Sequence, residues 1–161
     1  MMPCRRPNGA AGLLLLCLVF CGMNVAKAAI TELFVSDGQS GIALYGFDPV
    51  AFFIGREPQR GSAAFELQYQ GAVFRFANEG NRAAFQAHPD VYLPRYGGYD
   101  PVAIGRGSPT PGLPGLFVVR EKQLFLFSNE KSRAIFLSSP KEALAAAEFS
   151  WPQVRRGLVQ H

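Results

Sequence analysis

The chain has 161 residues, with 16 Lys plus Arg against 12 Asp plus Glu and a formal net charge of +4. Three of the basic residues and none of the acidic ones lie in residues 1–28, so the rest of the chain has 13 basic against 12 acidic residues, a net charge of +1. This near-neutral remainder gives no reason to expect a nucleic-acid partner. All three cysteines also lie in residues 1–28, which excludes disulfides, thiolate nucleophiles and cysteine-ligated metals from the remainder.

Residues 1–28 have the pattern of a secretory signal peptide. Arg5 and Arg6 precede an apolar run at 13–20, and Ala26 to Ala28 form a small-x-small cleavage site. The run is shorter than the roughly 20 residues of a membrane-spanning helix, although an uncleaved anchor is the alternative. We therefore expect a periplasmic or secreted protein, with no membrane span after cleavage and 133 remaining residues that suffice for one core.

The next elements are an arm and a short helix. Residues 29–44 are predicted to form an N-terminal arm with a turn near Asp37. Asp48 followed by Pro49 indicates a helix start, because Asp accepts a bond from a free backbone N–H and Pro has no N–H to leave unpaired. Gly55 is expected to end that helix.

A hairpin and a helix are predicted next. Apolar and polar residues alternate over 65–69, Gln70 and Gly71 suit a two-residue turn, and residues 73–76 form the return strand. Asn78 is then expected to cap a helix that ends at His88, before Pro89.

The same order recurs after a Pro/Gly-rich connector at 108–115. Strands are predicted at 116–120 and 123–127, followed by a helix from Asn129 through Phe136. A third helix is predicted to begin at Pro140 and run toward Trp151, which Pro152 follows.

The two hairpin–helix units also resemble each other in sequence. Residues 74–85 and 125–136 align at an offset of 51 with seven of twelve positions identical, and residues 47–51 recur as 99–103. The pattern is typical of an internal duplication, and convergence on a common strand–cap–helix grammar is the alternative. Either way we predict an α+β fold, a small single domain in which residues 45–107 and 116–161 share one core.

The chain resembles the YHS-domain family, which is related to other metal-sensing domains, and within it the secreted bacterial branch. The resemblance covers residues 42–107 and rests on spaced motifs in the family's order. These motifs are Gly46-Phe-Asp-Pro-Val-Ala-Phe-Phe53, Gly61-Ser62, Tyr69-Gln-Gly71, Phe74-Arg-Phe-Ala77, Asn81-Arg82, Phe85, Pro89, Tyr92 and Tyr96-Gly-Gly-Tyr99. It implies a scaffold but no settled activity.

The resemblance also indicates where metal ligands would lie. Related domains hold soft metals through cysteines at positions that here are Ala51, Ala77 and Asn81, and Asp100 replaces a further cysteine after Gly-Gly-Tyr. No cysteine-ligated metal is therefore expected, and the cofactor is unknown.

Three titratable residues are candidates for oxygen- or nitrogen-based chemistry. Asp48 and Asp100, each before a proline, are weak candidates to bind a hard cation together, with helix capping as the alternative. His88 is a candidate metal ligand or general base, with a capping or charge role at the helix end as the alternative.

A ligand-binding surface is predicted where the two related segments meet. Its candidate residues are Tyr45, Asp48, Tyr96, Gly97, Gly98, Tyr99 and Asp100. Glycines admit a close ligand and tyrosines offer hydroxyls on an apolar wall, whereas a plain core with a tight turn is the alternative.

The functional prediction is a secreted or periplasmic YHS-like binding or accessory protein, linked to metal handling and without intrinsic catalysis. Its predicted partner is a small ligand, a metal ion or an envelope protein. One alternative is a structural partner of a cell-envelope assembly. A second is an enzyme using Asp48, Asp100 and His88, which requires these groups to lie within hydrogen-bond reach of one another or of a substrate.

Overall fold

The computed structural model describes Met1 and residues 32–55 and 57–159. The predicted leader and its cleavage site therefore lie outside the described residues. None of the helices within these ranges is both long and apolar enough to cross a bilayer.

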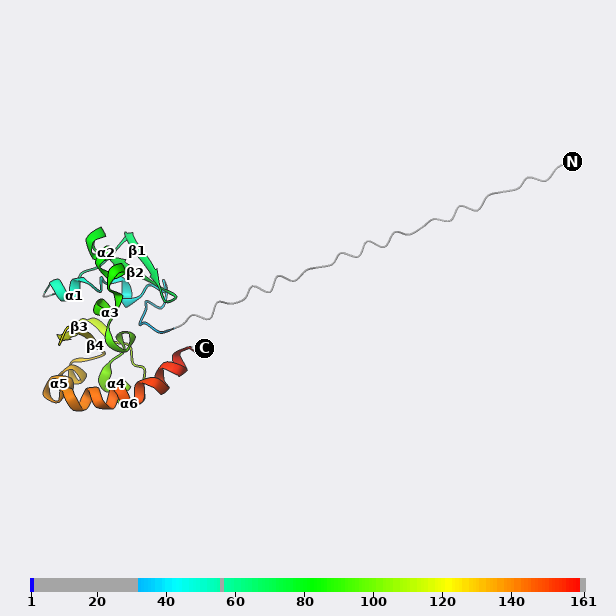
Figure 1. Ribbon diagram of the computed structural model, residues 1–161. Coiled ribbons are helices and arrows are strands. Elements are labelled where there is room, and N and C mark those ends of the chain that lie inside the picture. The colour runs from blue at the N-terminus through cyan, green and yellow to red at the C-terminus, as the bar shows by residue number, and fades with distance from the viewer. Residues whose placement is uncertain (2–31, 56, 160–161) are drawn as a thin grey trace.

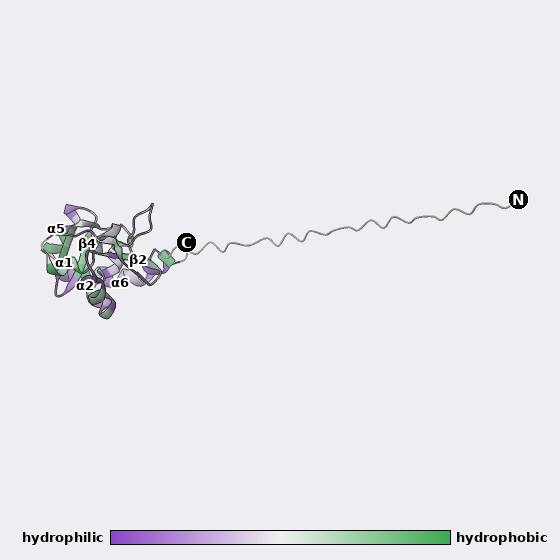
Figure 2. Ribbon diagram, turned by 90° about the horizontal axis from the view of Figure 1, so that it is seen from above, coloured by the Kyte–Doolittle hydropathy of each residue, from purple (hydrophilic) through white to green (hydrophobic). Residues whose placement is uncertain are grey.

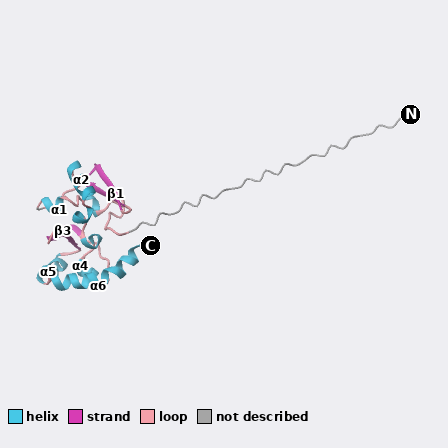
Figure 3. Cartoon of the chain, in the orientation of Figure 1, coloured by secondary structure: helices cyan, strands magenta, loops and turns pink. Residues whose placement is uncertain are grey.

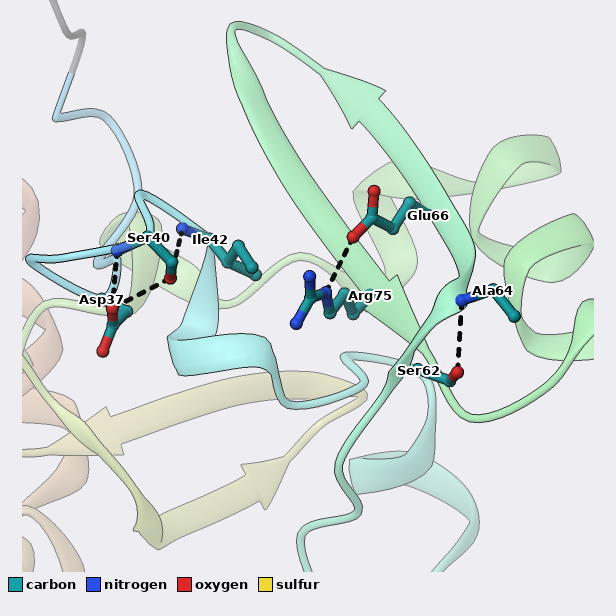
Figure 4. A network of polar contacts seen from close by, with 7 residues as sticks. All are labelled: Asp37, Ser40, Ile42, Ser62, Ala64, Glu66 and Arg75. Carbon is teal, nitrogen blue, oxygen red and sulfur yellow. Dashed lines mark hydrogen bonds and ion pairs between the residues drawn. The ribbon is translucent and has the colours of Figure 1, made fainter.

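The N-terminal arm is a tight turn. The Asp37 carboxylate accepts hydrogen bonds from the backbone N–H groups of Gln39 (3.1 Å) and Ser40 (2.8 Å), as Figure 4 shows for Ser40. Ser36 and Ala43 then pair as an isolated antiparallel bridge. Asp and Ser suit such turns because their side chains replace a backbone partner, and the arm agrees with the prediction.

Two short helices follow the arm. η1 (Leu44–Gly46) is a 3₁₀ turn, and α1 (Ala51–Ile54) is a single α-helical turn that ends at Gly55 as predicted.

The first hairpin consists of β1 (Ser62–Tyr69) and β2 (Ala72–Phe76), which are antiparallel. Gln70 (φ 46°) and Gly71 (φ 83°) both have positive φ, which the tight turn between right-twisted strands requires, so the predicted two-residue turn is confirmed. Glu66 and Arg75 face each other across the ladder with a 2.8 Å ion pair (Figure 4). β1 begins earlier than expected because a bulge lies between Ser62 and Glu66.

α2 (Glu79–Ala87) follows the hairpin, and α3 (Pro89–Tyr92) follows His88 directly. The Asn78 side chain accepts a hydrogen bond from the Asn81 N–H at 2.9 Å, which confirms the predicted cap. Phe85 is fully buried against the hairpin, whereas Ala83 of the same helix is exposed. Together η1 to α3 (Leu44–Tyr92) form the first unit.

The second unit (Arg95–Val159) repeats this order. It contains η2 (Arg95–Gly98), α4 (Pro101–Ile104), β3 (Leu113–Arg120), β4 (Gln123–Phe127), α5 (Glu130–Ser138) and α6 (Pro140–Val159). β3 begins at Leu113, inside the predicted connector 108–115. Pro114 fits there because it lies in the bulge between Leu113 and Phe117, where the ladder needs no N–H.

α6 corrects one prediction, because it does not end near Trp151. It continues through Pro152 to Val159. An interior proline costs about 3 kcal/mol, since it removes one helical hydrogen bond and crowds the preceding turn. Val154 and Leu158 lie beyond the proline and are both buried, so packing of the last turns against the core compensates for that cost.

The two units lie one above the other, with α6 along the outer side of the second (Figures 1 and 3). Each two-stranded sheet belongs to one unit, and a single hydrophobic cluster contains residues of both units. Phe52 of α1 meets Phe117 of β3 edge to face, with ring centroids 5.0 Å apart. Figure 2 shows that both hydrophobic (green) and hydrophilic (purple) segments occur along the ribbon. The predicted α+β single domain is confirmed.

Candidate functional site

Asp48 lies at the centre of the first unit and has no exposed surface. Its Oδ1 accepts hydrogen bonds from the N–H groups of Val50 (2.8 Å) and Ala51 (3.3 Å). Its Oδ2 accepts from the Ala77 N–H (2.8 Å) and from Asn81 Nδ2 (2.6 Å). One carboxylate therefore joins the start of α1 to the end of β2 and to α2.

Asp100 has the same place in the second unit and is also fully buried. Its Oδ1 accepts from the N–H groups of Val102 (2.9 Å) and Ala103 (3.3 Å) and from Ser132 Oγ (2.9 Å). Its Oδ2 accepts from the N–H (2.9 Å) and the Oγ (2.7 Å) of Ser128.

These contacts favour capping over cation binding for both aspartates. A carboxylate offers about four lone-pair positions, and donors of the chain itself take up that many or more on each residue. His88 is exposed at the C-terminal end of α2, where its backbone N–H donates to the Ala84 carbonyl at 3.0 Å. Within the described ranges no group of three or more His, Cys, Asp or Glu side chains could hold a metal ion.

Gly97 and Gly98 admit the N-terminal arm rather than leaving space for a ligand. A Cβ on Gly97 would lie 1.9 Å from the Leu33 carbonyl oxygen, and one on Gly98 would lie 2.6 Å from a methyl group of Val35. The Val35 N–H also donates to the Gly97 carbonyl at 2.9 Å. The close approach inferred from these glycines is therefore made by the chain's own backbone.

The tyrosines of the predicted surface are mostly structural. Tyr45 and Tyr96 both have φ 54°, a left-handed conformation at equivalent turns of the two units. The buried Tyr99 donates its hydroxyl to the Glu32 carbonyl at 2.8 Å. Burial, followed by the charge of Glu32, raises the pKa of Tyr99 to about 12, so this phenol is neutral at physiological pH.

One cleft does open at the predicted surface, at Tyr96 and Gly97. It has a volume of about 430 Å³ and lies where the arm, the β1–β2 turn, α3, the η2 segment and α6 meet. We call it the seam cleft. Its apolar lining includes Leu33, Phe34, Leu93, Pro94 and Trp151. Tyr96 and Trp151 meet edge to face with ring centroids 5.5 Å apart, so α6 forms one side of the cleft.

A polar cluster fixes the tyrosine in this wall. Glu148 accepts hydrogen bonds from the Tyr96 hydroxyl (3.0 Å) and from the Arg95 guanidinium, which also lies over the Tyr96 ring. Burial, followed by the hydrogen bond to Glu148, raises the pKa of Tyr96 to about 12. The charge of Arg95 is thus balanced by Glu148.

Two further charged residues line the seam cleft. Asp90 of α3 and Arg155 of α6 are both exposed, and neither forms an ion pair with any residue the structure describes. The cleft therefore combines an apolar wall with one free carboxylate and one free guanidinium. Its volume of a few hundred Å³ lies within the range of small-molecule sites, and its lining mixes polar and apolar groups.

The structure brings together only part of the predicted site. Tyr96 and Gly97 line the seam cleft, whereas Tyr45, Asp48 and the segment 98–100 do not. Sequence reasoning missed Asp90, Glu148 and Arg155, and it did not place Trp151 at a ligand site. Had α6 been continued through Pro152, the helical period would have placed Arg155 one turn beyond Trp151 and on its face.

The positions that the YHS resemblance singles out lie close together. Ala51, Ala77 and Asn81 each donate a hydrogen bond to the same carboxylate, that of Asp48. The chain matches no protein family model, no curated protein and no solved structure. Membership of the YHS family therefore stays a prediction.

Proposed function

We propose that the protein is a binding or accessory module, without catalysis of its own, that takes a small ligand in the seam cleft. The observation that carries this proposal is the composition of the cleft. Five separate segments line it. They contribute an aromatic pair, Tyr96 and Trp151, and two charges of opposite sign that pair with no other residue in the described ranges. Since buried capping bonds occupy Asp48 and Asp100, the enzyme alternative has no geometric support.

The cleft also has a built-in reporter, because Trp151 is the only tryptophan of the chain. Pools of amino acids, organic acids, sugars and nucleotides should be screened for a rise in melting temperature and a change in Trp151 emission. Leu93→Phe, which fills the cleft, is expected to weaken any such binding. Leu137→Phe is the matched control, because Leu137 is 55 % exposed and lies outside the cleft. A ligand that binds both variants equally, or no ligand in any pool, would contradict the proposal.

We also propose that the protein is exported and that its function is linked to metal handling, as the YHS resemblance suggests. The clustering of Ala51, Ala77 and Asn81 around Asp48 supports the resemblance, although no thiolate is present there. Titration with copper, zinc, nickel and iron, followed by mass and melting temperature, tests this version. If no metal is retained and the melting temperature stays constant, the link to metal handling is wrong. The proposal that the seam cleft binds a small ligand does not depend on this result.

A second candidate function is a structural partner of an envelope assembly. The observation in its favour is Phe149 on α6, which is 89 % exposed beside a groove that Pro152 and Gln153 also line. Contiguous exposed apolar surface marks contact sites, and Phe149 lies with the apolar side chains of Pro109 and Pro152 along the same groove. Cross-linking in the envelope should then capture a protein through this face, and Phe149→Ser should abolish the product.

A further inference from the structure

The charges around the seam cleft indicate which class of small molecule it accepts. Arg95 is neutralised by Glu148, so the remaining charges on the lining are the carboxylate of Asp90 and the guanidinium of Arg155. These two groups line one cleft but are not paired with each other, since no ion pair within 4.0 Å joins them. A ligand that carries both a positive and a negative group complements them.

The apolar wall adds a second requirement. Leu33, Leu93, Pro94 and the Trp151 indole offer no charge, so the body of the ligand is apolar. The Gln70 side chain at the rim adds a neutral amide, although its Nε2 already lies 3.1 Å from the Tyr69 hydroxyl. The cleft volume of about 430 Å³ suits a molecule of amino-acid size rather than a polymer.

We infer that the seam cleft binds a small zwitterion with an apolar group, such as a free apolar amino acid. Its carboxylate pairs with Arg155, its ammonium group with Asp90, and its side chain packs against Trp151 and Leu93. The inference rests on the proposed function and deepens it by naming the ligand class. Planar guanidinium groups bind carboxylates through two parallel hydrogen bonds, which favours an anion on the Arg155 side.

Three matched probes test the need for both charges. Leucine has both, 4-methylpentanoate lacks the ammonium group, and 3-methylbutylamine lacks the carboxylate. Titrations followed by Trp151 emission are expected to give the lowest Kd for leucine. Each mono-charged probe is expected to bind about two- to fivefold more weakly, as ion pairs with exposed side chains predict. Phenylalanine is titrated as a second zwitterion, because the cleft can prefer an aromatic ring to a branched side chain.

Two substitutions test which residue binds which charged group of the ligand. Arg155→Gln is expected to weaken the binding of leucine about two- to fivefold and to leave the binding of 3-methylbutylamine unchanged. Asp90→Asn is expected to weaken the binding of leucine by a similar factor and to leave the binding of 4-methylpentanoate unchanged. The controls are Arg156→Gln, the next residue of α6, and Glu121→Gln in the β3–β4 turn. Neither of these residues lines the seam cleft, and we expect neither substitution to alter the Kd of leucine.

The outcomes separate the ligand class from the proposed function. If a mono-charged probe binds as tightly as both amino acids, or if Arg155→Gln and Arg156→Gln act alike, the zwitterion inference is wrong and the seam cleft remains a ligand site. If neither amino acid changes Trp151 emission while a compound from the pools does, the same conclusion holds. If no compound of any kind changes it, both the inference and the proposed function fall.

Discussion

In both units a buried aspartate fixes the short helix, but the two units differ in the helices that pack against them. Asp48 and Asp100 each join a helix start to the end of a strand, and the strand bulges at Ser62 and Leu113 lie 51 residues apart. In the second unit the 20-residue α6 packs on α4. In the first unit α3 has only four residues, and Ile54 of α1 is 74 % exposed.

This difference separates scaffold from site. What the units share is the buried aspartate, the asparagine cap and the hairpin, and these features set the fold. What they do not share is α6, and α6 brings Trp151 and Arg155 to the seam cleft. A common origin of the units stays an interpretation, but their equivalent geometry makes each unit a control for the other.

The largest expected effect comes from removing the two aspartates. Asp48→Ala and Asp100→Ala each leave several buried donors without an acceptor, which should lower the free energy of unfolding by about 3–5 kcal/mol. Urea unfolding at neutral pH should give similar losses for both variants. A loss near zero for either one would show that the two carboxylates are not equivalent supports. Asp48→Asn and Asp100→Asn, which keep one acceptor, provide milder versions if the alanine variants do not fold.

Equivalent glycines should respond differently. Gly46 (φ 78°) and Gly97 (φ 64°) share the left-handed conformation, so alanine at either position costs about 1 kcal/mol for the backbone. A Cβ on Gly46 meets nothing nearer than 3.9 Å, whereas one on Gly97 overlaps the Leu33 carbonyl. Gly97→Ala should therefore cost about 2 kcal/mol more than Gly46→Ala in urea unfolding. Equal losses would mean that the arm does not pack here as described.

The hairpin turns provide a smaller contrast. Gly71 (φ 83°) and Lys122 (φ 60°) occupy the same turn position, and a lysine side chain is strained at positive φ. Lys122→Gly should raise the free energy of unfolding by about 0.5–1 kcal/mol, and Gly71→Lys should lower it by a similar amount. Thermal unfolding of both variants measures this. Changes of the same sign would contradict the equivalence of the turns.

The smallest effect at neutral pH concerns the buried tyrosines. The pKa values of Tyr96 and Tyr99 are raised to about 12, mainly by burial, from an ordinary value of 10.0. Between these values the unfolded chain ionises while the folded chain stays neutral, so stability is fully present below pH 10 and falls as the pH rises toward 12. Tyr96→Phe and Tyr99→Phe should each reduce the loss of folding stability between pH 10 and pH 12. A phenolate absorbance that titrates fully near pH 10 in the folded protein would contradict it.

Local features of the fold could be predicted from the sequence, because they depend on near neighbours. The Asn78 and Asn129 caps, both two-residue turns and the end of α1 all follow from residues close in the chain. The extension of α6 past Pro152 could not be predicted in this way, since distant packing of Val154 and Leu158 compensates for the proline.

The site was harder to predict for the same reason. Tyr96 and Gly97 were expected at a ligand surface and do line the cleft, but Asp90 and Arg155 reach it from separate helices. Such a convergence depends on how the two units and α6 pack. No sequence motif within either unit indicates this convergence.

We propose that this protein binds its ligand in the seam cleft. The most direct test is the Trp151 indole N–H signal in a ¹⁵N–¹H spectrum, because the single tryptophan gives a single such signal. During titration with leucine, or with any pool compound that raises the melting temperature, we predict that this signal moves with the Kd measured by calorimetry. If calorimetry reports binding while the indole signal stays fixed, the ligand binds elsewhere and the account is contradicted.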